Sequence, residues 1–82
     1  MRVLRPVRVY WEDTCGIQGW RHGEEAVKFT PAHCESIGWL VTQDSKRVLL
    51  ALSYNHEQGT VADCLIIPRG CVSKVVQLEV KK

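Results

Sequence analysis

Hydrophobic residues recur at every second position in several short stretches of the chain. Val7, Val9 and Trp11 alternate with more polar residues, and Ile37, Trp39 and Val41 alternate in the same way. A period of two places such residues on one face of a β-strand, whereas helices repeat every 3.6 residues. The pattern therefore predicts five strands, near residues 6–11, 36–42, 47–54, 61–67 and 71–79.

The stretch 47–54 is apolar on both of its faces. Val48, Leu50 and Leu52 fall on one face, while Leu49 and Ala51 fall on the other. This predicts a central strand, since only a strand covered on both sides gains from two apolar faces. One small barrel cannot enclose both faces, so we expect Leu49 or its neighbours to meet another subunit or the 12–35 segment. The protein is therefore expected to be a homo-oligomer.

The segments between these strands carry turn signals. Residues 12–20 read as a long loop closed by Trp20, and residues 43–46 and 55–60 read as polar turns. Only Pro68-Arg69-Gly70 separates the last two strands, a connection that suits a corner. Thr30-Pro31 resembles an N-cap followed by proline at the first helical position, which predicts one helical turn at 31–35. Together these elements predict a mostly β fold in which five strands form a small barrel, closed or nearly so.

Composition places the chain among ordinary globular domains. Its 82 residues, 45% hydrophobic and 24% charged, form a single domain, and a net charge of +2 gives no bulk preference for nucleic acid. The beginning of the chain shows no apolar leader, and no stretch is long enough for a membrane helix. We therefore expect a cytoplasmic protein without a membrane partner. Its cysteines, at positions 15, 34, 64 and 71, should be free thiols that are small and mostly buried.

Two resemblances emerge from short motifs. The run Leu65–Val76, with Arg69-Gly70 between apolar strands, resembles the second motif of Sm-like barrels, although the first motif of that family is absent from Arg47–Asn55. Over almost the whole chain, the order Trp11-x-Asp13, Gly19-Trp20, Ser36–Val41, Leu50–Ser53 and Ile67–Gly70 resembles a family of small bacteriophage-encoded proteins of unassigned function. This resemblance implies an SH3-like or Sm-like barrel and a phage origin, but no activity.

The densest group of chemically versatile side chains lies between residues 11 and 21. Trp11 and Trp20 offer flat faces that stack on nucleobases, and Arg21 or Arg69 could hold a phosphate. The candidate ligand-binding residues are Trp11, Asp13, Trp20, Arg21 and Arg69. The alternative is structural: the indoles cap the core, Asp13 accepts turn amides and Arg69 is solvated. The N-terminal arginines at positions 2, 5, 8 and 21 form either a solvated face or a phosphate-contacting stripe.

Metal and catalytic signatures are weak. No Cys-x-x-Cys pair exists, and the adjacent His33 and Cys34 are badly spaced for one ion, so neither a metal nor a cofactor is expected. A nucleophilic pair such as Cys15 with His22 would need an orienting third group. We expect a non-enzymatic, phage-encoded protein that blocks or sequesters a host component in the host cytoplasm, either a host protein or a nucleotide-like molecule. An Sm-like RNA or DNA binder is the alternative, and a small hydrolase using Asp13 and a histidine is a third.

Overall fold

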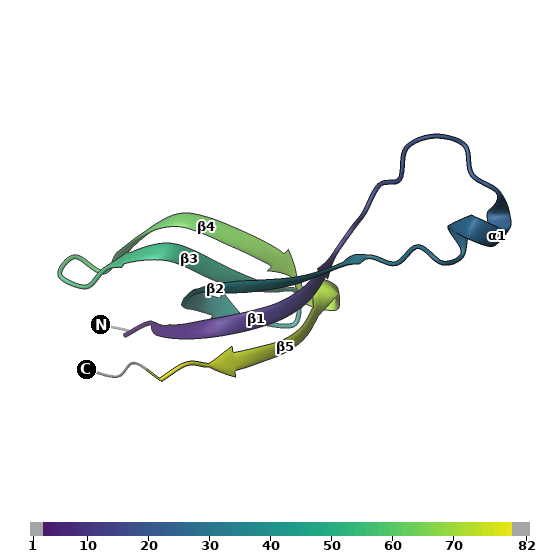
Figure 1. Ribbon diagram of the computed structural model, residues 1–82. Helices are drawn as coiled ribbons and strands as arrows, with labels where there is room; N and C mark the ends of the chain where they lie inside the picture. Colours follow the sequence, from purple (N-terminus) through teal and green to yellow (C-terminus); the bar gives the residue numbers. More distant parts are fainter. Residues whose placement is uncertain (1–2, 80–82) are drawn as a thin grey trace.

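The computed structural model describes residues 3–79 and contains five strands and two short helical segments (Figure 1). In chain order they are β1 (Arg5–Asp13), α1 (Gly23–Ala26), β2 (Ala32–Gln43), β3 (Arg47–Asn55), β4 (Thr60–Pro68), the 3-10 turn η1 (Arg69–Cys71) and β5 (Val72–Gln77). All five strands predicted from the alternating pattern are present. The last one ends at Gln77, two residues before the predicted end.

The strands form one open antiparallel sheet in the order β4-β3-β2-β1-β5. The central position predicted for 47–54 is confirmed, because β3 lies between β2 and β4. The expected closure is wrong: β4 and β5 are consecutive in sequence but occupy opposite edges of the sheet, joined by η1 alone (Figure 1). β5 turns away from β4 to pair with β1, so both strands leave one edge without a partner among the described residues.

The core is built from aliphatic side chains of β1, β3 and β4. Val9 and Val48 are fully buried, and Val7, Leu50 and Ile67 are nearly so. Val7, Val9 and Ile67 alternate with more exposed neighbours, as the period-two pattern requires, whereas Leu50 is followed by the equally buried Ala51. Around this cluster pack partly buried hydrophobic residues, namely Trp11, Leu40, Cys71, Val72 and Val75.

The helical turn predicted at 31–35 is wrong, since residues 32–43 form β2. The described backbone pairs Ala32 with Asp13 and Glu35 with Tyr10, and these ladder bonds outweigh the local preference of Thr30-Pro31 for a helix start. Proline fits here because Pro31 precedes the strand and lies outside the ladder. The helical turn lies earlier, at Gly23–Ala26.

Between β1 and β2 the chain leaves the sheet as a projecting arm, residues 14–31, which carries α1 at its far end (Figure 1). Every residue from 12 to 33 is exposed. The radius of gyration is 16.5 Å, against about 12 Å for a compact domain of this length. The arm therefore does not cover the outer face of β3, which was one of the two expectations for that face, and Trp20 does not close a loop against the body.

Candidate functional site

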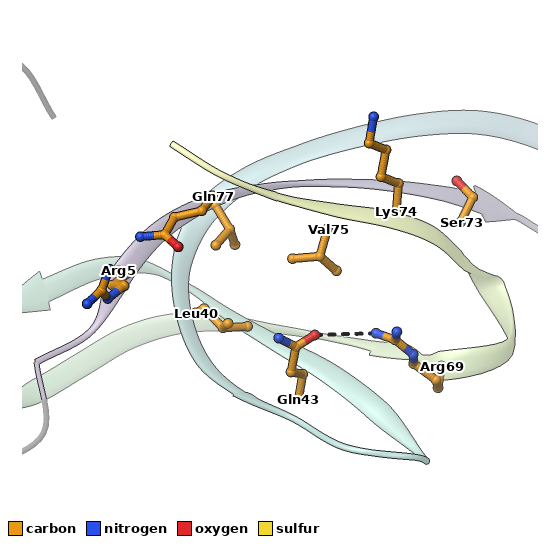
Figure 2. Close-up of a pocket in the computed structure, with 9 residues that line it drawn as sticks. Arg5, Leu40, Gln43, Arg69, Ser73, Lys74, Val75 and Gln77 are labelled. Carbon is orange, nitrogen blue, oxygen red and sulfur yellow. Dashed lines mark hydrogen bonds between the residues drawn. The ribbon is translucent and has the colours of Figure 1, made fainter. Parts of the chain in front are cut away.

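A hollow lies where β5, the start of β1, the end of β2 and η1 meet (Figure 2). Its volume is about 460 Å³. A register shift between Leu40 and Thr42 marks a β-bulge in β2, and bulges bend a strand. The lining residues are Arg5, Val7, Leu40, Gln43, Arg69, Ser73, Lys74, Val75 and Gln77. We call this hollow the Arg5–Arg69 cavity.

The charges around the Arg5–Arg69 cavity are all positive. Arg5 and Arg69 lie at opposite ends, while Lys74 stands on the β5 rim with its amine turned outward (Figure 2). Within residues 3–79, no aspartate or glutamate lines the cavity. Two guanidinium groups around one cavity without a carboxylate create a positive potential that attracts anions.

Arg69 is held in place from its backbone and from its side chain. Its amide N–H donates to the carbonyl of Lys46 at 2.9 Å, which fastens η1 to the β2–β3 turn. Its Nη1 donates to Oε1 of Gln43 at 3.4 Å, and the Gln43 amide nitrogen then points toward the cavity (Figure 2). The cavity therefore has an amide donor beside a positioned guanidinium, a combination suited to the oxygens of a phosphate or carboxylate.

The carboxylate nearest in sequence, that of Asp44, is used inside the β2–β3 turn. Its Oδ1 accepts hydrogen bonds from the backbone amides of Lys46 at 2.8 Å and Arg47 at 3.0 Å. These bonds hold the pKa of Asp44 below its ordinary value of 3.8, because they stabilise the ionised form. Its Oδ2 lies 3.7 Å from Arg47 Nε. Asp44 thus stabilises the turn that positions Gln43 and Arg69.

The floor of the Arg5–Arg69 cavity is apolar. Leu40 and Val75 point into it (Figure 2), and Val7, which also lines the cavity, is almost completely buried. An apolar floor excludes water from one side of a bound group, which strengthens hydrogen bonds and charge interactions at the rim. The cavity can therefore bind an anion that carries an apolar portion.

Trp11 and Asp13, two of the five ligand-binding residues predicted from sequence, make structural contacts. Trp11 packs against the core, and its indole N–H donates to Oγ of Ser36 at 3.0 Å. Asp13 Oδ1 accepts a hydrogen bond from the backbone amide of Thr14 at 2.9 Å. These contacts match the structural alternative for both residues.

Trp20 and Arg21 lie elsewhere, on the arm. The Trp20 side chain is fully exposed, and both residues line a small hollow with His22 and Glu25. Arg69 lines the Arg5–Arg69 cavity, to which neither arm residue contributes. The structure therefore divides the five predicted residues among the sheet, the arm and the cavity.

The polar cavity residues that were not among the candidates from sequence are Gln43, Ser73, Lys74 and Gln77. Gln43 follows the β2 pattern as an ordinary turn residue, and Lys74 is one lysine within an alternating strand. Arg5 did belong to the basic stripe noted near the N-terminus. Its companion Arg8 faces Glu35 instead, with Nε 3.9 Å from Oε1, and Arg2 lies outside the described residues.

The cysteines and histidines do not build a site in the described part of the chain. Between residues 3 and 79, no three His, Cys, Asp or Glu side chains gather in a metal-binding group. All four cysteines are unpaired, but Cys15 and Cys64 are exposed and the other two half-buried, so the expectation of mostly buried cysteines is wrong. Cys15 is exposed because it lies on the arm, and Cys64 is exposed because it lies on the edge strand β4.

Comparison with known proteins adds no relative: no protein-family model, curated protein or solved structure matches the chain. Among the described residues, no helix has the length and hydropathy needed to span a membrane.

Proposed function

We propose that this is a non-enzymatic binding protein that holds a small phosphate-bearing anion in the Arg5–Arg69 cavity. The observation that carries the proposal is the placement of Arg5 and Arg69 around a cavity of about 460 Å³ that no carboxylate of residues 3–79 lines. Arginine suits this role because its planar guanidinium donates paired hydrogen bonds to phosphate oxygens. Gln43 and Gln77 add neutral donors and acceptors that orient the ligand.

The composition of the cavity lining supports binding over catalysis. Its polar groups are arginine, lysine, glutamine and one serine, and Ser73 Oγ donates to the carbonyl of Tyr10 at 3.0 Å. General acid–base chemistry is most often carried out by a histidine or a carboxyl group within reach of the substrate, and the lining residues include neither.

The resemblance to bacteriophage proteins suggests the biological setting. On that basis we propose that the anion belongs to a host component, such as a nucleotide-like signal, which the protein sequesters or blocks in the host cytoplasm. We further propose that the protein belongs to the SH3-like or Sm-like barrel type and works as a homo-oligomer. The open sheet is then the fold of one subunit. The order of the strands and the two unpaired edges support this.

Ligand-dependent thermal stability, followed by calorimetric titration, tests the binding proposal. The probes are inorganic phosphate, pyrophosphate, a nucleoside diphosphate and a single-stranded oligonucleotide. We expect one of the small phosphates to raise the melting temperature, since ligand binding to the native state stabilises it. A nucleic-acid binder would instead prefer the oligonucleotide, with an affinity that falls steeply as salt increases.

Four variants locate the site. Arg5→Gln and Arg69→Gln should each weaken binding about tenfold or more, because a charge-assisted hydrogen bond is worth roughly 1.5–3 kcal/mol. Lys28→Gln removes an equal charge from the exposed arm and should leave affinity unchanged. If Arg21→Gln, and not the cavity variants, abolishes binding, the ligand site lies on the arm and the cavity assignment is wrong. No stabilisation by any probe also contradicts the proposal.

A further inference from the structure

The projecting arm exposes large apolar side chains that gain nothing from the chain's own fold. Trp20 is fully exposed and Val27 is 81% exposed, while Ile17 and Phe29 are each close to half exposed. Exposed apolar residues scattered singly are ordinary on protein surfaces, but four within the one projecting segment 14–31 favour an interaction surface there.

The base of the arm is an ordered two-stranded ribbon. β1 and β2 remain paired through Glu12 with His33 and Asp13 with Ala32, beyond Trp11, the last residue of β1 that pairs with β5. Glu12 Oε1 lies 3.4 Å from Nδ1 of His33 across this ribbon. The ribbon therefore holds the arm away from the body and presents its apolar side chains at a distance from the sheet (Figure 1).

The sheet itself has an apolar hollow of about 250 Å³ over β2, β3 and β4. Among its lining residues Ile37 is 58% exposed, Leu52 69% and Leu65 40%. An apolar cavity of roughly 150 Å³ already accepts a benzene molecule, so this hollow accommodates an aromatic side chain. Asp63, which has a left-handed backbone with φ 58°, supplies a carboxylate at its lining.

We propose that two copies of this chain exchange arms, and that the Trp20 indole of each enters the hollow lined by Leu52 and Leu65 of the other. Arg21, the next residue along the arm, then pairs with Asp63. The complementarity is both apolar and electrostatic: an indole followed by a cation on the arm matches an apolar hollow with a carboxylate on the sheet.

A second copy is the occupant because each chain carries both halves of the contact. In a reciprocal exchange about a two-fold axis, each arm binds the hollow of the other copy, so that both arms and both hollows are occupied. Two-fold symmetry of this kind is the usual form of a homodimer. Aromatic side chains bury roughly 150–250 Å² each. The exposed apolar residues of two arms and two hollows can therefore bury on the order of 1,500 Å², within the range of stable interfaces.

This inference is independent of the proposed anion site. None of the residues lining the Arg5–Arg69 cavity belongs to the arm or to the hollow on β2, β3 and β4. A failure of dimerisation therefore leaves anion binding intact, and a failure of anion binding leaves the dimer intact. Phosphate titration of each variant below separates the two.

Sedimentation equilibrium of the full chain over a range of concentrations tests the exchange. We expect wild type to dimerise, and Trp20→Ala and Leu52→Lys each to weaken the dimer at least ~30-fold, since a central aromatic anchor is worth about 2 kcal/mol or more. Ile66→Lys is the matched control: Ile66 is also 58% exposed on β4, but it follows Leu65 and so points to the opposite face of the sheet. It should dimerise like wild type.

Mixing the two disrupted variants gives the sharpest test. A heterodimer of Trp20→Ala with Leu52→Lys keeps one intact contact, formed by the wild-type arm of the second protein and the wild-type hollow of the first. The mixture should therefore dimerise more tightly than either variant alone. A partner protein of another kind would not produce this complementation, and a mixture that remains monomeric contradicts arm exchange.

The charge pair is tested by a double-mutant cycle with Arg21→Gln and Asp63→Asn. Asparagine tolerates the left-handed backbone at position 63, so the second variant removes the charge alone. We expect the double variant to lose less than the sum of the two single losses, because the groups interact. Additive losses would place Arg21 away from Asp63, and a wild-type protein that is monomeric at high micromolar concentration would overturn the whole proposal.

Discussion

At position 38 the backbone of β2 approaches β3 more closely than any side chain would allow. A Cβ added to Gly38 would lie 2.8 Å from the carbonyl oxygen of Ala51 and 3.4 Å from Cβ of Leu50. The neighbour is backbone in the middle of the sheet, so the two strands would have to separate. We expect Gly38→Ala to lower the unfolding free energy by about 1–3 kcal/mol, measured by urea denaturation.

Gly16→Ala is the control for this prediction. Gly16 lies on the arm, and a Cβ added there meets nothing within 4 Å. Its effect on the unfolding free energy should stay within about 0.5 kcal/mol. Equal effects of the two variants would mean that β2 and β3 are not held together at Gly38.

Asp44 gives the stability a dependence on pH. Its pKa is lowered in the folded state by the two backbone amides, so its contribution is fully present above its ordinary pKa of 3.8. That contribution is lost as the pH falls through the lowered pKa. Asp44→Asn keeps an oxygen acceptor but cannot titrate. The difference in unfolding free energy between wild type and Asp44→Asn should therefore decrease on acidification below about pH 4. A difference that is constant across this range would contradict the role of the ionised carboxylate.

At the scale of single elements, β4 shows how one strand divides its residues between the core and solvent. Ile67 is 1% exposed and joins the core, whereas the adjacent Ile66 is 58% exposed. Ile67→Ala should cost about 2–5 kcal/mol of unfolding free energy, and Ile66→Ala under about 1 kcal/mol. Thermal or urea unfolding of the two variants, measured below the concentration at which copies associate, checks the contrast.

The strands were predictable because their information is local. Val7 and Val9 alternate with Arg8 and Tyr10, the pattern of a half-buried strand, whereas the run around Val48 and Leu50 is apolar on both faces, the pattern of a central strand. The conformation of segment 31–35 was not predictable from local sequence, because it depends on pairing with Tyr10–Asp13, some twenty residues earlier in the chain. Local capping signals carry no information about such a partner.

The candidate site depended even less on local sequence. Arg69 was identified from its motif, but the cavity forms only when Arg5, Gln43 and Arg69 are brought together from β1, the end of β2 and η1. The order of the strands in the sheet determines whether these three residues come together, and that order depends on pairing between segments that are far apart in sequence. The cluster between residues 11 and 21 looked compact in sequence, yet β1 holds Trp11 against the core while the arm carries Trp20 outward.

At the scale of the whole molecule, the sheet and the arm are separate units. Asp13 and Ala32 are cross-strand partners, so a two-residue Asn-Gly turn can replace residues 14–31 without moving either strand. We expect this variant to unfold cooperatively, with a free energy equal to that of wild type or up to ~2 kcal/mol higher, because a shorter loop costs less closure entropy. Urea denaturation followed by circular dichroism, below the concentration at which copies associate, measures this. Loss of the cooperative transition would mean that the arm contributes to the core.

The left-handed backbone of Asp63 bears on the tendency of the protein to form fibrils. β4 is an edge strand with exposed Val61, Leu65 and Ile66, a combination that invites fibril growth by the addition of strands from other molecules. Asp63 interrupts the regular repeat of that edge and places a charge in its middle, and the β3–β4 register omits its pairing with Leu52. We therefore expect Asp63 to act as a gatekeeper that opposes amyloid formation. Asp63→Val, which restores a straight and uncharged edge, should bind thioflavin T on prolonged incubation under conditions in which the wild-type protein stays clear.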